Sequence, residues 1–251
     1  MLISKLFAFL TSLPVVVIAT KHPSFRGAQL FHQGEVTTSD ATQSMCNLGY
    51  DICNPEDKGD GEYREYIGDS VIVLGHLSPD TDAVGAAIIR AWELRVASNN
   101  GKGPICARAA INTDEINRET IFVLDYFGID APDTESVSNG EVYAVVDTNN
   151  LEELTRDYSP QHAKLHSIVD HHRIAGTIKT DEPIEFDNRP IASTGSVLYQ
   201  RAKSSGLNVP GKGCKVNIAG LMLSTILSDT LVFRSPTTTT LDIEAGKSEM
   251  L

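Results

Sequence analysis

From residue 70 onward, short apolar runs alternate with longer stretches of helical periodicity. The runs that have the length and composition of buried strands are residues 70–75, 105–109, 142–147 and 165–170. The stretches with a helical pattern are residues 83–98, 118–128, 196–206 and 215–229. Strands that alternate with helices form parallel sheets covered by helices. The sequence therefore predicts an α/β fold, a doubly wound and mostly parallel sheet with helices on both faces, over residues 70–251.

The first 69 residues have a different texture. Residues 1–20 combine Lys5 with an apolar run and small residues after it, which is the pattern of a secretory signal peptide. A misplaced start site or an organelle-targeting segment would give a similar pattern. Residues 21–69 are rich in Gly, Asp, Ser, Thr and Asn, and we interpret them as an irregular extension. No other stretch is apolar enough to cross a bilayer, so we expect no stable membrane insertion.

Charge and cysteine content narrow the classes of function. The formal net charge is −12, which gives the chain no reason to attract nucleic acid or an anionic membrane surface. None of the four cysteines falls in a C-x-x-C pair, which argues against zinc clusters and thioredoxin-like motifs. Cys46 and Cys53 lie in a loop-like segment. Either a disulfide in an exported protein or two unrelated free thiols fits the sequence there.

Aspartate and histidine residues gather where the apolar strands end. His76, Asp80 and Asp82 directly follow the first strand. In open α/β sheets, ligands bind just beyond the carboxyl ends of the strands, and imidazole with carboxylates suits Mn²⁺ and similar cations. The alternative for Asp82 is that it caps the helix starting near residue 83, and Asp80 could be a turn former.

Two further aspartates end apolar elements. Asp147 ends a strand, where a buried carboxylate is costly without a cation or hydrogen bonds. Asp229 ends a largely apolar helix, where its charge opposes the helix dipole and a metal ion would resolve the conflict. An ordinary loop-starting aspartate and an ordinary polar residue at a helix end are the alternatives.

The segment Asp170-His171-His172 ends another buried strand. Adjacent residues on an extended chain point to opposite sides, so the two histidines are expected to serve different purposes. One would ligate a metal while the other faces the substrate, and Asp170 would orient an imidazole.

Together these positions predict a metal centre. Four carboxylates and two imidazoles suffice for two cations if Asp147 bridges them and water fills the remaining positions, an arrangement suited to phosphoryl hydrolysis. The predicted metal ligands are His76, Asp80, Asp82, Asp147, His171 and Asp229.

Several segments, read in order along the chain, resemble a known family. Those that resemble the DHH phosphoesterase superfamily are GHLSPDTDAVGAAI, VVDTNN, SIVDHHR and ILSDT. Those that narrow the resemblance to the family II, manganese-dependent inorganic pyrophosphatases are NRETIFVLDYFGIDAP, ASTGSVLYQ and SDTLVFRSPTTTTLD. PDTD at residues 79–82 also fits pyrophosphatases better than the PDGD of the nanoRNA and cyclic-dinucleotide phosphodiesterases.

The resemblance implies an enzyme that hydrolyses pyrophosphate to two phosphates, by attack of a water that bridges two Mn²⁺ ions, with Co²⁺ or Mg²⁺ as substitutes. It assigns His76 and Asp80 to one ion, Asp82, His171 and Asp229 to the other, and Asp147 to both. It makes His172 the catalytic residue that contacts the substrate or the nucleophilic water. It also implies a cytoplasmic homodimer, in contrast to the secretory route that residues 1–20 suggest.

Two departures from the family pattern stand out. The family usually has D-H-N-E where this chain has Asp147-Thr148-Asn149-Asn150, so the surroundings of the metals are expected to differ. Family members also continue into a second domain whose Lys and Arg residues close over the phosphates, and no S-R-K-K-Q-like segment occurs here. We therefore expect a DHH domain that lacks this lid. The alternatives are an exopolyphosphatase-like DHH phosphohydrolase and a lidless metal-binding module with little activity.

Overall fold

The computed structural model describes residues 71–97, 105–113, 115–135, 141–154, 164–214 and 216–248. All of them fall within one compact unit, Thr38–Leu251. The predictions for residues 1–20, for residues 21–69 and for the pair Cys46 and Cys53 lie outside the described residues. Within the described residues, Cys106 and Cys214 are both disulfide-bonded. None of the described helices combines the length and the apolar character that crossing a membrane requires.

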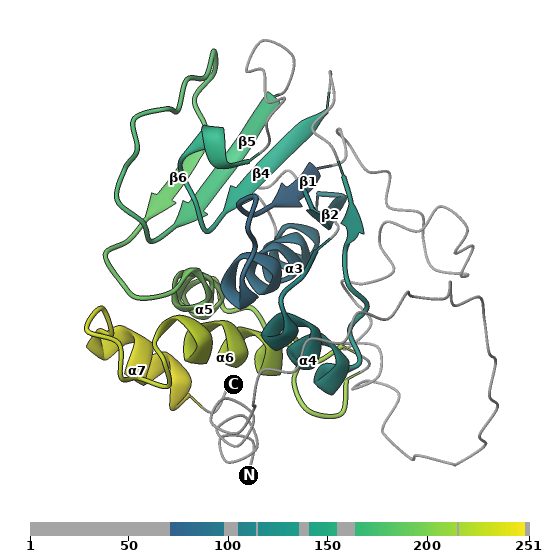
Figure 1. Ribbon diagram of the computed structural model, residues 1–251, viewed down its shortest axis with the longest axis vertical. Coiled ribbons are helices and arrows are strands. Elements are labelled where there is room, and N and C mark those ends of the chain that lie inside the picture. The colour runs from purple at the N-terminus through teal and green to yellow at the C-terminus, as the bar shows by residue number, and fades with distance from the viewer. Residues whose placement is uncertain are drawn as a thin grey trace, which may run out of the picture. The chain divides into compact units, whose positions relative to one another are not determined.

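Six parallel strands form a single sheet in the order β3-β2-β1-β4-β5-β6 (Figure 1). The strands are β1 (Val71–Leu74), β2 (Ala107–Ile111), β3 (Asp133–Thr134), β4 (Val142–Val146), β5 (Lys164–Asp170) and β6 (Glu185–Asn188). Each predicted strand is present within a few residues of its expected position. The predicted α/β class with a parallel sheet is confirmed.

Five α-helices and one short 3-10 helix accompany the sheet in the described residues. They are α3 (Thr81–Val96), α4 (Arg118–Phe127), η1 (Leu151–Glu153), α5 (Thr194–Ser204), α6 (Ile218–Asp229) and α7 (Thr240–Gly246). Asn117 caps α4 at its start, and Gly128 ends it in the left-handed conformation that glycine adopts without strain. Ser193 and Thr239 cap α5 and α7 through their hydroxyl groups.

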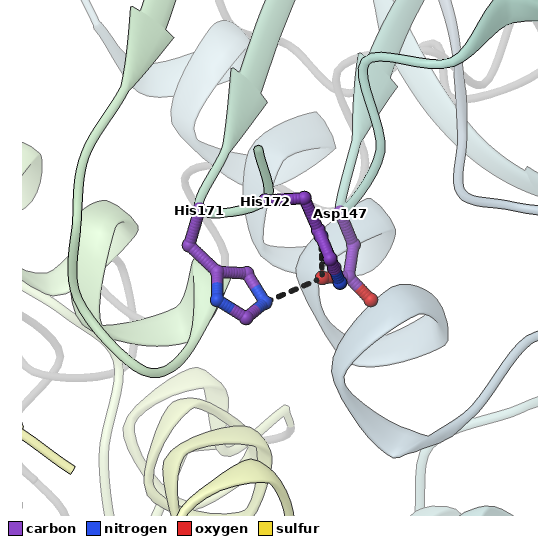
Figure 2. Close-up of side chains that lie close together, drawn as sticks. All are labelled: Asp147, His171 and His172. Carbon is purple, nitrogen blue, oxygen red and sulfur yellow. Dashed lines mark hydrogen bonds and ion pairs between the residues drawn. The ribbon is translucent and has the colours of Figure 1, made fainter. Parts of the chain in front are cut away.

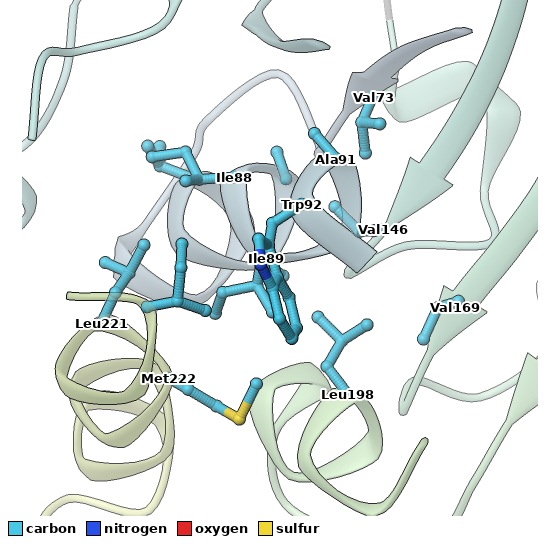
Figure 3. Close-up of a cluster of buried hydrophobic side chains, with 14 of the residues drawn as sticks. Val73, Ile88, Ile89, Ala91, Trp92, Val146, Val169, Leu198, Leu221 and Met222 are labelled. Carbon is cyan, nitrogen blue, oxygen red and sulfur yellow. The ribbon is translucent and has the colours of Figure 1, made fainter. Parts of the chain in front are cut away.

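The main core lies between the sheet and the layer formed by α3, α5 and α6 (Figures 1 and 3). Val73, Val146 and Val169 point from three neighbouring strands toward Trp92 of α3 and Leu198 of α5. Fully burying one such side chain contributes about 1.5–3 kcal/mol. This packing fixes the position of α3 and α5 relative to the strand ends, where the polar residues lie.

The opposite face of the sheet buries a smaller cluster. Side chains alternate between the two faces of a strand, so Val145 and Ile168 point away from α3. They pack against Leu151 of η1 and against Leu154. The 3-10 helix therefore covers part of the second face and anchors the loop that follows β4.

The strand order has a reversal between β1 and β4. From β1 the chain proceeds outward through β2 to β3, and then returns to β4 on the other side of β1 before continuing to β5 and β6. In sheets of this kind, the loops on either side of the reversal separate and leave a crevice at the carboxyl ends of the two central strands. The fold therefore places the loops after β1 and β4 at a natural ligand-binding position.

Candidate metal centre

His76 and Asp80 lie in the loop that joins β1 to α3. His76 is half-buried, and its Nε2 lies 3.4 Å from Asp147 Oδ2 and 4.0 Å from Asp80 Oδ1. Asp80 is the N-cap of α3, because its Oδ1 accepts a hydrogen bond from the backbone N–H of Ala83 at 2.9 Å. This bond fixes the Asp80 carboxylate while leaving its other oxygen available.

Asp82 does not cap its own helix. The alternative that it is an N-cap is wrong, because α3 starts at Thr81 and Asp80 caps it. The Asp82 carboxylate is fully buried and crosses to the start of α5. There it accepts hydrogen bonds from Ser193 Oγ at 3.1 Å, from the Gly195 N–H at 3.0 Å and from the Thr194 N–H at 2.6 Å. A helix N-terminus favours a negative charge, so α5 stabilises this buried aspartate.

Asp147, which follows β4, is the centre of the cluster. It is 1% exposed and has a left-handed backbone with φ of 59°, a conformation that aspartate tolerates better than most residues. Its Oδ1 lies 3.2 Å from His171 Nε2, and its Oδ2 lies 3.4 Å from His76 Nε2. The two oxygens of one carboxylate therefore face two different sets of side chains.

His171 and His172 both approach Asp147 from the end of β5 (Figure 2). Their ring centroids are 4.2 Å apart, so the expectation that they point to opposite sides is wrong. The alternation applies within a strand, and β5 ends at Asp170. Asp170 Oδ1 accepts the backbone N–H groups of both histidines, at 2.7 and 3.1 Å, and thereby bends the chain. The two rings still differ in exposure, 13% for His171 and 51% for His172.

Asp170 itself binds the second histidine. His172 Nδ1 lies 2.9 Å from Asp170 Oδ1, and Asn149 Nδ2 donates to Asp170 Oδ2 at 2.5 Å. Asn149 also donates to the carbonyl oxygen of Arg173 and accepts from the N–H of Ala175. The loop after β4 therefore holds the histidine loop after β5 in place, in keeping with the orienting role expected for Asp170.

Asp229 enters from the last turn of α6, and its Oδ2 lies 3.3 Å from His171 Nε2. The three residues after Thr230, Leu231 to Phe233, all have positive φ between 48° and 62°. Non-glycine residues rarely adopt this conformation, and a β-branched residue such as Val232 does so under strain. Thr230 holds the turn, because its Oγ1 accepts the N–H of Phe233 at 3.0 Å. The chain thus reverses sharply directly after the aspartate.

The five other predicted ligands and His172 therefore lie around Asp147. The groups whose ligand atoms all lie within 4.8 Å of one another are His76 with Asp80 and Asp147, Asp82 with Asp147, His171 and Asp229, and Asp147 with His171 and His172. Asp147 belongs to every group. One carboxylate therefore joins two clusters of potential ligands.

Burial and hydrogen bonds have opposite effects on the pKa values of Asp147 and His171. Burial alone would raise the pKa of Asp147, but hydrogen bonds with His171 and His76 hold it at about 2. Burial alone would lower the pKa of His171, whereas hydrogen bonds to Asp147 and Asp229 raise it to about 11. The pKa of Asp82 is raised well above its usual range, first by burial and then by the charges of Asp229 and Asp147.

These shifts reveal an excess of negative charge. Among the described residues, the ion pairs of Asp80, Asp82, Asp147 and Asp229 involve histidines only, with no lysine or arginine. Even if all three of these histidines, His76, His171 and His172, were protonated, they could not neutralise four carboxylates. Divalent cations would supply the missing charge, and oxygen and imidazole ligands in these positions suit Mn²⁺. The residues present therefore fit divalent cations.

Sequence reasoning did not single out Ser193 and Thr194 as part of this site. Their side chains contact Asp82 and Asp147, at 3.1 Å in each case. The available signal was a serine followed by threonine and glycine at a helix start, where backbone N–H groups are free to bind an anion. Gly195 is required there, because a Cβ at that position would collide with Thr225 Oγ1.

Comparison with known proteins supports the resemblance. Residues 70–226 match the DHH family, N-terminal domain. Two bacterial relatives, each named "Probable manganese-dependent inorganic pyrophosphatase", are 36% identical to this chain. The Enterococcus faecalis protein matches over 178 residues, 70% of this chain and 53% of the relative. The Staphylococcus haemolyticus protein matches over 176 residues, 70% of this chain and 52% of the relative. The chain thus spans about half the length of these relatives.

A solved structure gives the same result in three dimensions. A crystal structure titled "Methanococcus jannaschii putative family II inorganic pyrophosphatase" superposes with a TM-score of 0.58 at 33% identity. The superposition covers 70% of this chain and 54% of the other. The resemblance predicted from the motifs is confirmed, and the match over residues 70–226 shows that the chain belongs to the DHH family.

Proposed function

We propose that this chain hydrolyses inorganic pyrophosphate to two phosphates with two divalent cations. The observation that carries the proposal is the placement of Asp147, whose two oxygens face His76 on one side and His171 on the other. A carboxylate shared in this way sets two ions close together. The names of the relatives and of the solved structure support pyrophosphate as the substrate and manganese as the metal.

In this proposal, the seven side chains divide into two ligand sets and one substrate contact. His76 and Asp80 would hold one ion with Asp147, and Asp82, His171 and Asp229 would hold the other, again with Asp147. When bound, the ions would polarise the phosphoryl oxygens and lower the pKa of a water molecule. The four carboxylates offset the charge of two divalent ions, so the loaded site would not repel an anionic substrate.

His172 is the residue placed to act on the substrate. Its Nδ1 is held by Asp170, which leaves Nε2 as the ring nitrogen that can meet a bound phosphate. The hydrogen bond to Asp170 raises the pKa of His172, and the Asp170 carboxylate would stabilise a protonated ring at this position. Half of the side chain is exposed, which gives the substrate access. His172 would therefore orient the anion and donate a proton from Nε2.

The proposed cofactor is Mn²⁺, two ions per chain, with Co²⁺ or Mg²⁺ as substitutes. The test is phosphate release from pyrophosphate by the metal-free 251-residue chain after addition of each ion. We expect turnover with Mn²⁺, loss of turnover in Asp147→Asn, and no change in Asp125→Asn, an exposed position on α4. Absence of turnover with all three ions, or an active Asp147→Asn variant, would refute the proposal.

Substrate range separates pyrophosphatase from the two other functions considered. An exopolyphosphatase-like phosphohydrolase would release phosphate faster from tripolyphosphate and longer chains than from pyrophosphate. A lidless metal-binding module would bind Mn²⁺ and turn over neither. We expect pyrophosphate to be the fastest of these substrates when the three are compared at equal concentration.

We propose that the chain forms a homodimer through an edge of its sheet. Among the described strands, β6 forms one edge of the sheet and pairs with β5, and it carries the exposed side chain of Phe186. An open edge can pair with a second copy of itself, which favours the predicted homodimer. Light scattering on the chain and on Phe186→Lys would test this pairing.

The location proposal is the secretory route, with the cytoplasm as its alternative. Disulfide bonds persist in oxidising compartments, so the bonded state of Cys106 and Cys214 favours this route. Mass spectrometry of the protein from its native source distinguishes the two. An intact Met1 with reduced thiols at both positions would favour the cytoplasm.

A further inference from the structure

Thr194, the first residue of α5, contacts two carboxylates of the metal centre at once. Its backbone N–H donates to Asp82 Oδ2 at 2.6 Å, and its hydroxyl donates to Asp147 Oδ1 at 3.1 Å. The hydroxyl must be the donor, because an ionised carboxylate can only accept. Thr194 is 0% exposed, so bulk water does not compete for either bond.

The contact with Asp147 is selective for one oxygen. Asp147 Oδ1 receives the Thr194 hydroxyl and faces His171, whereas Oδ2 faces His76. The torsion that turns an aspartate carboxylate about its Cβ–Cγ bond has a broad and shallow preference. The backbone of Asp147 places its Cβ, and the contacts of the two oxygens decide this rotation. The Thr194 hydroxyl supplies a restraint on the rotation.

The restraint is itself held rigidly. Ser193 caps α5 and accepts the N–H of Gly195 at 3.0 Å. Gly195 packs so closely against Thr225 of α6 that no side chain fits between them. The backbone of Thr194 is therefore held in place by the packing of α5 against α6.

We propose that Thr194 is a positioning residue whose hydroxyl fixes the rotation of the Asp147 carboxylate, so that each oxygen faces its own cation and the two cations form one coupled pair. The inference rests on the proposed function, because it requires Asp147 to be shared. Partners of this kind around a ligand typically change metal affinity by about 10–100-fold.

The test compares three substitutions in α5 of the full chain, titrated with Mn²⁺ alone. Thr194→Val removes the hydroxyl and keeps the shape and the backbone N–H. Thr194→Ser restores the hydroxyl without the methyl group. Ser196→Ala is the matched control, because Ser196 is equally buried and its hydroxyl has no hydrogen-bond partner in the described part of the chain. Calorimetry gives the affinities, and electron paramagnetic resonance distinguishes a spin-coupled Mn²⁺ pair from isolated ions.

We expect about 10–100-fold weaker Mn²⁺ binding in Thr194→Val and replacement of the coupled spectrum by the six-line signal of isolated ions. Thr194→Ser and Ser196→Ala should keep the wild-type affinity and the coupled spectrum. A coupled pair in Thr194→Val, or a Thr194→Ser variant as weak as Thr194→Val, would overturn the inference. If Thr194→Val does not fold, Thr194→Ala takes its place with the same expectations. A wild-type chain that binds no Mn²⁺ pair would instead refute the proposed function.

Discussion

Two clusters of charged side chains border α3, and their charges are balanced in different ways. The first is the metal centre, where the ion-pair partners of Asp80, Asp82, Asp147 and Asp229 among the described residues are all histidines. The second, here called the arginine cluster, joins α3 and α5 to β6. Its members are Arg90, Glu93, Glu185, Asp187, Arg189 and Arg201.

The positive and negative charges within the arginine cluster cancel. Arg90 is 2% exposed and binds Glu93 and Glu185 at 2.6 Å each. Arg201 contacts Glu93, Glu185 and Asp187 at 2.7–2.9 Å. Three arginines thus match three carboxylates, and the cluster has no need of a further cation. Among the described residues, the carboxylates of the metal centre have no lysine or arginine partner, and this difference supports the proposal that divalent cations balance their charge.

The largest expected effect is on Mn²⁺ content, which should fall for a substitution in the metal centre and not for one in the arginine cluster. Asp147→Asn keeps the left-handed backbone, since asparagine also tolerates it, but it removes the shared charge. We expect the Mn²⁺ content to fall from about two ions per chain to near zero, because both sets of ligands lose their common member. Asp187→Asn, the matched change in the arginine cluster, should retain both ions. Elemental analysis after dialysis measures both variants, and full occupancy in Asp147→Asn would contradict the bridging role.

The second-largest expected effect is on the free energy of unfolding, with metal binding retained. Arg90→Met leaves Glu93 and Glu185 with Arg201 alone, and breaking a buried ion pair such as Arg90–Glu93 costs about 3–5 kcal/mol. Urea unfolding of the metal-free chain should show this loss, while the folded variant should still bind Mn²⁺. A stability within 1 kcal/mol of wild type, on the order of an exposed ion pair, would show that the cluster is more solvated than its burial suggests.

A smaller effect is expected on turnover alone. His172→Ala should reduce pyrophosphate hydrolysis by about 10²-fold, the lower end of what a positioned proton donor contributes. Its Mn²⁺ affinity should stay within a few-fold of wild type, because His172 is assigned to the substrate. His166→Ala is a suitable control, since this histidine lies on β5 near Arg90 and away from the metal centre. Loss of metal in His172→Ala would move this residue into the ligand set.

The smallest effect concerns acid. Burial would raise the pKa of Asp187, but hydrogen bonds with Arg189 and Arg201 lower it below the ordinary value of 3.8. Its contribution to stability is therefore present above pH 3.8 and is lost as the pH falls through the lower, folded-state value. Urea unfolding at pH 6 and pH 3 should reveal a loss of about 1 kcal/mol from this pair. Asp187→Asn should lack that component, and equal acid sensitivity would place its origin in other groups.

The fold was predictable where side chains repeat with a regular period. The strand of residues 142–147 and the helix of residues 83–98 were expected because apolar residues dominate them. β6 was not, since Glu185 and Asp187 turn inward to arginines on α3 and α5 that are distant in sequence. Such a strand is stabilised by ion pairs rather than by apolar burial, so its own sequence shows no strand pattern.

The site was predictable where ligands follow strands directly. His76 and Asp147 could be placed because parallel strands bring their carboxyl ends to one edge of the sheet. Thr194 could not, since its contact with Asp147 exists only after α5 has docked on the sheet. The directions of His171 and His172 were wrong for a related reason: Asp170 bends the chain as soon as the strand ends.

The entry of Asp229 from α6 has a consequence for how the protein matures. His76 lies in the first loop of the described sheet, whereas Asp229 comes after every strand has been made. The second set of ligands is therefore complete only when α6 has docked against α3. A chain in which α6 has not yet packed against α3 would bind Mn²⁺ weakly. The cation would therefore bind preferentially to chains that have finished folding. Mn²⁺ at about a hundred times its dissociation constant would add about 2.7 kcal/mol to their stability.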